Sequence, residues 1–411
     1  MLGTGVFVSL AFAVQFAGDA VVLSLLLAAG VAACNGLSSA QLAACHPVSG
    51  GTYEYGYRWL HPALGFAAGW LFLLAKSASA AAAALGLGAY VGAALGWPLG
   101  AASTFVGALA VCAFTALVLR GIDRTVQVNA IMVLLTLSGL FLYIGAGLYV
   151  GFFGPNELQP PLDAAIPVTG QGVLRGAALL FVAFTGYGRI ATLGEEIRDP
   201  LHAIPRAVIV TVVFAGVLYA AVATSSLLAV GAVAFADSFD DQVASLVAVA
   251  YARFGRGVVA MVTLSAITAL CGVLLSLILG LSRVVLAMAR RGDMPARFGG
   301  LNAKRTAAPA ATLLIGALVL SLVLVGSVQV AWSFSALTVL LYYGIANLAA
   351  LRVDDAARFV PRAVSWAGLF GCLLLAGWID LRSWLLGLAA LGLGALWFGV
   401  AAHARRRGVR A

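Results

Sequence analysis

The chain has 411 residues, of which 63% are hydrophobic and only 9% charged, with a mean hydropathy of +1.06. Soluble domains carry about 25% charged residues, so this composition excludes a water-soluble globular fold. The 24 Lys and Arg residues exceed the 15 Asp and Glu residues. We attribute this excess to loops that face anionic lipid and expect no nucleic-acid partner.

Apolar stretches recur along the whole chain, separated by short polar connectors. A membrane-spanning helix needs about 20 mostly apolar residues, and helices satisfy their backbone polar groups internally in lipid. We therefore predict an all-α polytopic membrane protein of about twelve spans. The predicted spans lie near residues 3–17, 20–44, 63–92, 101–119, 126–152, 172–193, 206–231, 257–288, 309–326, 329–351, 363–379 and 383–402.

Two of these spans, the first and the sixth, combine closely spaced glycines with a threonine: Gly3-Thr4-Gly5 and Thr185-Gly186. Glycine weakens a helix by about 1 kcal/mol relative to alanine, so a helix can unwind at such a place. Unwinding exposes amide groups at one half-helix and carbonyls at the other, which suits a zwitterion. Glycines that only permit close helix packing are the alternative.

The basic residues predict the orientation of the chain. If the N-terminus is cytoplasmic, the outer connectors hold only Arg175, Arg253, Arg256 and Arg382, whereas 17 of the 24 basic residues fall on the cytoplasmic side. This asymmetry follows the positive-inside rule. We therefore predict a multi-pass protein of the cell (inner) membrane with both termini cytoplasmic. The acidic segment 237–241 lies on the outer side, as a lid over a vestibule or as a plain loop.

Four stretches resemble, in order, the signatures of one transporter family. They are Gly3–Phe7; His46–Tyr55 followed by Gly65–Trp70; Glu195–Pro200 with Ile204–Ala207; and Ser282–Arg283 with Ala287–Pro295. Each stretch alone is weakly to moderately specific. Together they resemble the amino acid permeases of the amino acid–polyamine–organocation superfamily, over nearly the whole chain.

The resemblance implies a LeuT-like fold with alternating access around a site near the membrane midplane. It implies a first repeat over 1–152, an inverted second repeat over 172–352, appended helices over 363–402 and a basic tail at 403–411. It also implies a substrate site. The site would hold a carboxylate on the Gly3–Gly5 stretch, at the amides of Thr4 and Gly5, and an ammonium on carbonyls of Val182, Ala183 and Thr185, with Phe184, Gly186 and Tyr187 lining or gating the pocket.

The chain departs from the family pattern at its start. Relatives usually carry a half-helix before the Gly-Thr-Gly stretch, whereas this sequence begins there. We expect a start codon placed too far downstream, in preference to a degenerate transporter.

A second departure is Lys76, which lies in the interior of the third span. A lysine at this depth costs at least about 2.5–3.5 kcal/mol and is a functional candidate by default. Some sodium-independent relatives place a lysine on span five, where this chain has Thr136. We predict that Lys76 supplies that charge instead, near Thr268 or Ser276 of span eight, and changes protonation during transport. Snorkelling to the interface is the alternative.

The sequence favours a secondary transporter of neutral amino acids, proton-coupled or sodium-independent. No Asp or Glu lies in the interior of a predicted span, so a cationic amino acid or polyamine, the alternative substrate, finds no counter-ion. A transport-dead sensor is a further alternative. The sequence shows no intramembrane acid or histidine cluster for an enzyme and no phosphate-binding loop. We expect no cofactor and no metal; the partners are an amino acid, the lipid bilayer and, in the proton-coupled case, protons.

Overall fold

A computed structural model describes residues 2–46, 50–97, 100–121, 126–154, 166–188, 200–239, 244–302 and 307–408. Within these ranges the chain forms helices and no strand, which confirms the predicted all-α class.

The helices of the first half are η1 (Gly5–Ser9, a π-helix), α1 (Leu10–Ala17), η2 (Gly18–Ala20), α2 (Val21–Cys45), α3 (Thr52–Trp59), α4 (Pro62–Leu95), α5 (Ala101–Leu119) and α6 (Val126–Phe153). Those of the second half are α7 (Gly170–Phe184), η4 (Thr185–Tyr187), α9 (Pro200–Asp237), α10 (Ser245–Arg253), α11 (Arg256–Arg290), η5 (Ala296–Gly299), α12 (Pro309–Val325), α13 (Val328–Leu351), η6 (Asp355–Ala357), α14 (Arg362–Ala376) and α15 (Leu381–Gly408).

Every predicted span coincides with one of these helices. Among the described residues, eight helical runs are long and apolar enough to cross a membrane, and one of them, Gly5–Cys45, contains the first two predicted spans. Pro309–Val325 and Arg362–Ala376 are shorter apolar helices. The end of the predicted sixth span, 189–193, lies outside the described residues. Large apolar side chains such as Phe153, 76% exposed, cover the outside of the bundle, as expected of a polytopic membrane protein.

The helix contacts come in pairs related by a shift of five spans. Helix α4 packs against α13, and its counterpart α11 packs against α6. In the same way, α2 contacts α7 while α9 contacts α1, and α4 contacts α5 while α11 contacts α12. Two structural repeats would produce this pattern, and the repeats over 1–152 and 172–352 remain a prediction.

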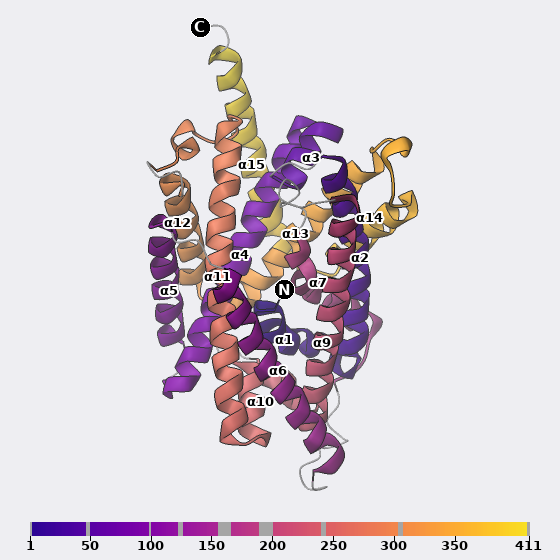
Figure 1. Cartoon of the computed structure of the whole chain (residues 1–411), viewed down its shortest axis with the longest axis vertical. Helices are drawn as coiled ribbons and strands as arrows, with labels where there is room; N and C mark the ends of the chain where they lie inside the picture. Colours follow the sequence, from indigo (N-terminus) through magenta and orange to yellow (C-terminus); the bar gives the residue numbers. More distant parts are fainter. Residues whose placement is uncertain are drawn as a thin grey trace.

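Helix η1 is buried within the bundle, whereas α15 extends beyond it. Figure 1 shows α3 and the C-terminal end of α15 at one end of the molecule and α10 at the other. Arg58 belongs to α3, whereas Arg253 ends α10. These are the ends that the charge distribution assigns to the cytoplasm and to the outside.

Helix α3 is fastened to the end of α11 by five side chains, which we call the α3 clasp: Tyr53, Glu54, Tyr57, Arg291 and Asp293. The hydroxyls of Tyr53 and Tyr57 donate to Oδ2 of the fully buried Asp293, at 2.5 and 2.7 Å. Arg291 pairs with Glu54 at 2.7 Å, and its guanidinium lies 4.2 Å from the centre of the Tyr57 ring. These contacts hold a connector helix rigidly against the membrane-spanning bundle.

Candidate functional site

The first interruption is at the start of the chain. The backbone N–H groups of Val6 and Phe7 both donate to the carbonyl of Gly3, at 3.1 Å each, and the helix begins as the π-helical η1. A side chain at Gly5 would place its Cβ 2.4 Å from the Cβ of Ala183, closer than real Cβ atoms approach. Glycine at this position therefore allows η1 to contact α7 directly.

The second interruption is in the sixth span. Helix α7 ends at Phe184 and continues as the 3₁₀ turn η4. The hydroxyl of Thr185 donates to the carbonyl of Val182 at 2.7 Å, so this side chain turns back onto its own helix. Both glycine-containing stretches thus depart from regular α-helix but stay helically wound, as π- and 3₁₀-turns that often mark functional positions. The unwinding expected from the sequence stays a prediction.

A cavity of about 640 Å³ lies where the two interruptions meet. The predicted site residues that line it are Thr4, Gly5, Val182, Ala183, Thr185, Gly186, Lys76, Thr136, Thr268 and Ser276. Thr4 and Val182, which are 178 positions apart in sequence, are therefore brought to one place.

Three predicted residues do not line this cavity. Gly3 packs against α11, because a Cβ there would lie 2.4 Å from Val273. The ring centres of Phe184 and Tyr219 are 5.4 Å apart. The ring centres of Tyr187 and Tyr343 are also 5.4 Å apart, so Phe184 and Tyr187 both pack between helices.

Thr4 provides an unoccupied polar group at the cavity. Its hydroxyl is buried and has no hydrogen-bond partner among the described residues, although buried hydroxyls are normally paired. The first amides of a helix also lack partners within that helix, and the helix dipole favours negative charge there. The start of η1, which continues through α1 to Ala17, therefore offers donors to an anionic group.

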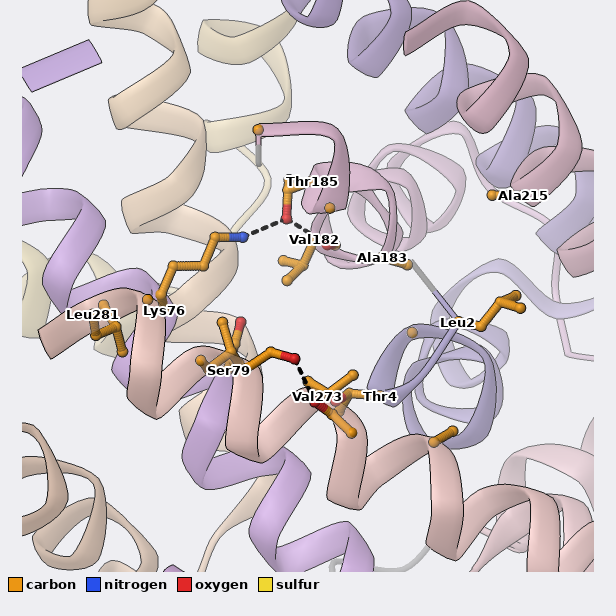
Figure 2. A pocket seen from close by; sticks show the side chains of 18 of the residues that line it. Leu2, Thr4, Lys76, Ser79, Val182, Ala183, Thr185, Ala215, Val273 and Leu281 are labelled. Atoms are coloured by element: carbon orange, nitrogen blue, oxygen red, sulfur yellow. Dashed lines mark hydrogen bonds between the residues drawn. The ribbon is translucent and has the colours of Figure 1, made fainter. Parts of the chain in front are cut away.

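Lys76 contacts the sixth span. Its Nζ donates to the hydroxyl of Thr185 at 2.7 Å, and Figure 2 shows the side chain reaching toward Thr185. Thr268 and Ser276, the predicted neighbours, line the same cavity, but their hydroxyls donate to carbonyls of their own helix, at 2.9 and 2.6 Å.

The sequence analysis missed several residues of the cavity wall. Ser79 lies three positions after Lys76, so the helical i, i+3 spacing was a signal that both face one side of α4. Its hydroxyl lies 2.8 Å from that of Ser335. Trp332 and Arg283 also line the cavity. Trp332 carried no signal, because its place depends on how α13 packs.

The cavity extends toward one end of the bundle and is closed at the other. Along α11 its lining runs from Ala269 to Ala287, about 27 Å at 1.5 Å per residue, toward the α3 clasp. At the opposite end, Phe12 stacks on Phe239 with ring centres 5.0 Å apart. The side-chain amide of Gln15 donates to the carbonyl of Phe239 at 3.1 Å. Phe239 thus packs over the far end of α1, and residues 240–241 of the acidic segment lie outside the described residues.

Comparisons with known proteins identify the family of the chain. A family model for amino acid permeases matches residues 1–379. An uncharacterised transporter of Mycobacterium tuberculosis is 38% identical over 408 residues, which cover 99% of this chain and 89% of the relative. The branched-chain amino acid permease of Bacillus subtilis is 29% identical over 336 residues, 77% of this chain and 70% of the relative. The methylthioribose transporter of Bacillus subtilis is 29% identical over 319 residues, 74% and 67%. The chain belongs to the amino acid permease family.

Proposed function

We propose that the protein is a secondary active transporter that moves neutral amino acids across the cytoplasmic membrane, with both termini in the cytoplasm. The observation that carries the proposal is the Thr4 hydroxyl, which is buried without a partner among the described residues in a cavity lined by the start of η1 and the end of α7. Membership of the permease family supports transport rather than catalysis. The similarity to a branched-chain amino acid permease supports a neutral substrate.

The two interrupted helices suit the two ends of a zwitterion. The amides of Thr4 and Gly5, with the Thr4 hydroxyl, would hold the substrate carboxylate at the start of η1. The carbonyl end of α7, at Val182 and Ala183, would face the ammonium, because the C-terminal end of a helix carries partial negative charge. Ala183 lies against Gly5, so the two half-sites are adjacent.

Alternating access is supported by the asymmetry of the cavity. One end is packed shut by Phe12, Gln15 and Phe239, whereas the lining continues toward the α3 end. A transporter that faces one side has this shape, and the paired helix contacts suggest that repeats 1–152 and 172–352 exchange roles when it faces the other.

Lys76 and Arg283 argue against a cationic substrate. Among the described residues that line the cavity these two are charged and none is acidic. A substrate with a cationic side chain would lose hydration there without gaining a counter-ion from these residues. We further propose that the Lys76 ammonium replaces a sodium ion, so that transport needs no sodium and runs on a proton or substrate gradient.

Uptake by the purified protein in proteoliposomes tests the proposal. We expect radiolabelled neutral amino acids to accumulate in sodium-free buffer, with lysine and putrescine excluded. Dissipating the pH gradient separates proton coupling from exchange, and binding without uptake would favour the sensor. A panel in which no amino acid binds or accumulates would contradict the proposal.

A further inference from the structure

The carbonyl end of α7 is already supplied with donors by the protein. The carbonyl of Val182 accepts from the Thr185 hydroxyl at 2.7 Å. The carbonyl of Ala183 accepts from the hydroxyl of Tyr219 at 3.4 Å, and that of Thr185 from Tyr343 at 3.5 Å. These are the three carbonyls that a substrate ammonium would need.

An ammonium group of the protein lies at the same helix end. Lys76 can only donate, so its 2.7 Å bond makes the Thr185 oxygen the acceptor. The Thr185 hydroxyl therefore donates its own proton to the carbonyl of Val182, and this hydroxyl links Lys76 to that carbonyl. The positive charge that complements the negative end of α7 therefore comes from α4.

The half of the site at Thr4 differs from the half at the end of α7 in how its polar groups are paired. The Thr4 hydroxyl has no partner among the described residues, and it lies at the start of a helix, where negative charge is favoured. The anion-binding half is therefore open, whereas the ammonium-binding half is filled from within the chain. Substrate groups gain most where the protein has left its own groups unpaired.

We infer that the substrate carboxylate is the required group and that its α-ammonium is dispensable, because the Lys76 ammonium, proposed above to stand in place of sodium, also supplies the positive charge at the carbonyl end of α7. The inference rests on the proposed function and narrows it: the accepted class includes monocarboxylates that carry the same side chain but no amino group. Each carbonyl oxygen keeps a second lone pair, so amino acids still bind, with little gain from their amino group.

Three probes of one shape test this directly. They are leucine, 4-methylpentanoate, which lacks the amino group, and 3-methylbutylamine, which lacks the carboxylate. In competition for binding to the purified full chain, we expect 4-methylpentanoate to match leucine within about threefold and the amine to be at least about a hundredfold weaker, since charge-assisted hydrogen bonds carry the difference. If another amino acid gives the larger uptake, its own desamino and decarboxy analogues replace these probes.

Substitutions at Lys76 and Thr185 identify the cause. In Lys76→Met the ammonium position is vacated, so leucine should become preferred over 4-methylpentanoate by about tenfold or more. Lys76→Arg keeps a cation and should keep the two affinities similar. Thr185→Val removes the hydroxyl that links Lys76 to the Val182 carbonyl while it keeps the lysine. It should shift the ratio of the leucine and 4-methylpentanoate affinities in the same direction as Lys76→Met. The ratio within each variant is independent of its yield.

The outcomes separate this inference from the function on which it rests. If leucine binds and 4-methylpentanoate binds more than about thirtyfold more weakly in the wild-type protein, the inference is overturned and the permease assignment stands. An unchanged ratio in both Lys76→Met and Thr185→Val also overturns it. If neither a carboxylate nor an amino acid from the panel binds, the proposed function fails together with the inference.

Discussion

The α3 clasp and the central cavity are both polar clusters in an otherwise apolar bundle, and they differ in how their groups are paired. In the clasp, the carboxylate of Asp293 accepts two tyrosine hydroxyls, and Arg291 pairs with Glu54. In the cavity, the hydroxyl of Thr4 is buried without a partner among the described residues. Satisfied buried groups fix a structure, whereas unsatisfied ones are available to a ligand.

We expect the largest effect on transport from a substitution at Gly5, which lines the cavity. In Gly5→Ala the new Cβ would lie 2.4 Å from the Cβ of Ala183, so η1 and α7 must separate. We expect uptake in proteoliposomes to fall below about one per cent, because misplacing binding groups by about 1 Å costs about a hundredfold. Gly30→Ala is the matched control, since no atom lies within 4 Å of its Cβ. Equal uptake by the two variants would show that the close contact is unnecessary.

The next effect is on stability, at the clasp. Asp293→Ala leaves the hydroxyls of Tyr53 and Tyr57 without their acceptor at a buried position. Breaking a buried charged network costs about 3–5 kcal/mol, so the unfolding temperature in detergent should fall clearly. Asp355→Ala serves as the control, because this side chain is 73% exposed and its ion pairs contribute little. If the α3 clasp does not stabilise the fold, Asp293→Ala and Asp355→Ala will have equal unfolding temperatures.

At the cavity, a smaller effect on binding should appear without loss of stability. Thr4→Val removes a hydroxyl that has no described protein partner, so we expect substrate affinity to fall about tenfold while the unfolding temperature is kept or raised. Thr312→Val removes a buried hydroxyl outside the cavity that also has no partner in the described part of the chain, and it should leave binding unchanged. Equilibrium binding to the purified protein distinguishes the two. If Thr4→Val lowers the unfolding temperature and leaves substrate affinity unchanged, the Thr4 hydroxyl stabilises the fold and does not bind substrate.

The smallest effect is expected at Glu54. Burial raises the pKa of this carboxyl above its ordinary value of 4.5, and this outweighs the lowering by Arg291. The folded protein therefore holds this proton more tightly than the unfolded chain, so stability falls as pH rises through that range. Glu54→Gln should flatten this pH dependence and change stability by less than about 1 kcal/mol, as for other partly exposed ion pairs. The measurement is the unfolding temperature of both proteins between acidic and neutral pH. A steeper dependence on pH in Glu54→Gln than in the wild-type protein would contradict the raised pKa of Glu54.

The spans could be predicted from the sequence because apolar runs set them directly; α5, for example, begins and ends at the predicted residues. Helices α3 and α10 were missed, since short amphipathic helices in connectors lack an apolar run. The partner of Lys76 was also beyond prediction. Thr185 lies 109 positions away, and only the packing of α4 against the interrupted sixth span brings the two together. The close contact between Gly5 and Ala183 of another span likewise depends on how the helices pack.

A structure of the protein in lipid nanodiscs, determined with the transported amino acid bound, tests the central claim most directly. We predict ligand density between Thr4 and Ala183, with the substrate carboxylate against the Thr4 hydroxyl and the first amides of η1. Density at another place in the bundle, with the Thr4 hydroxyl still facing an empty cavity, would contradict the account.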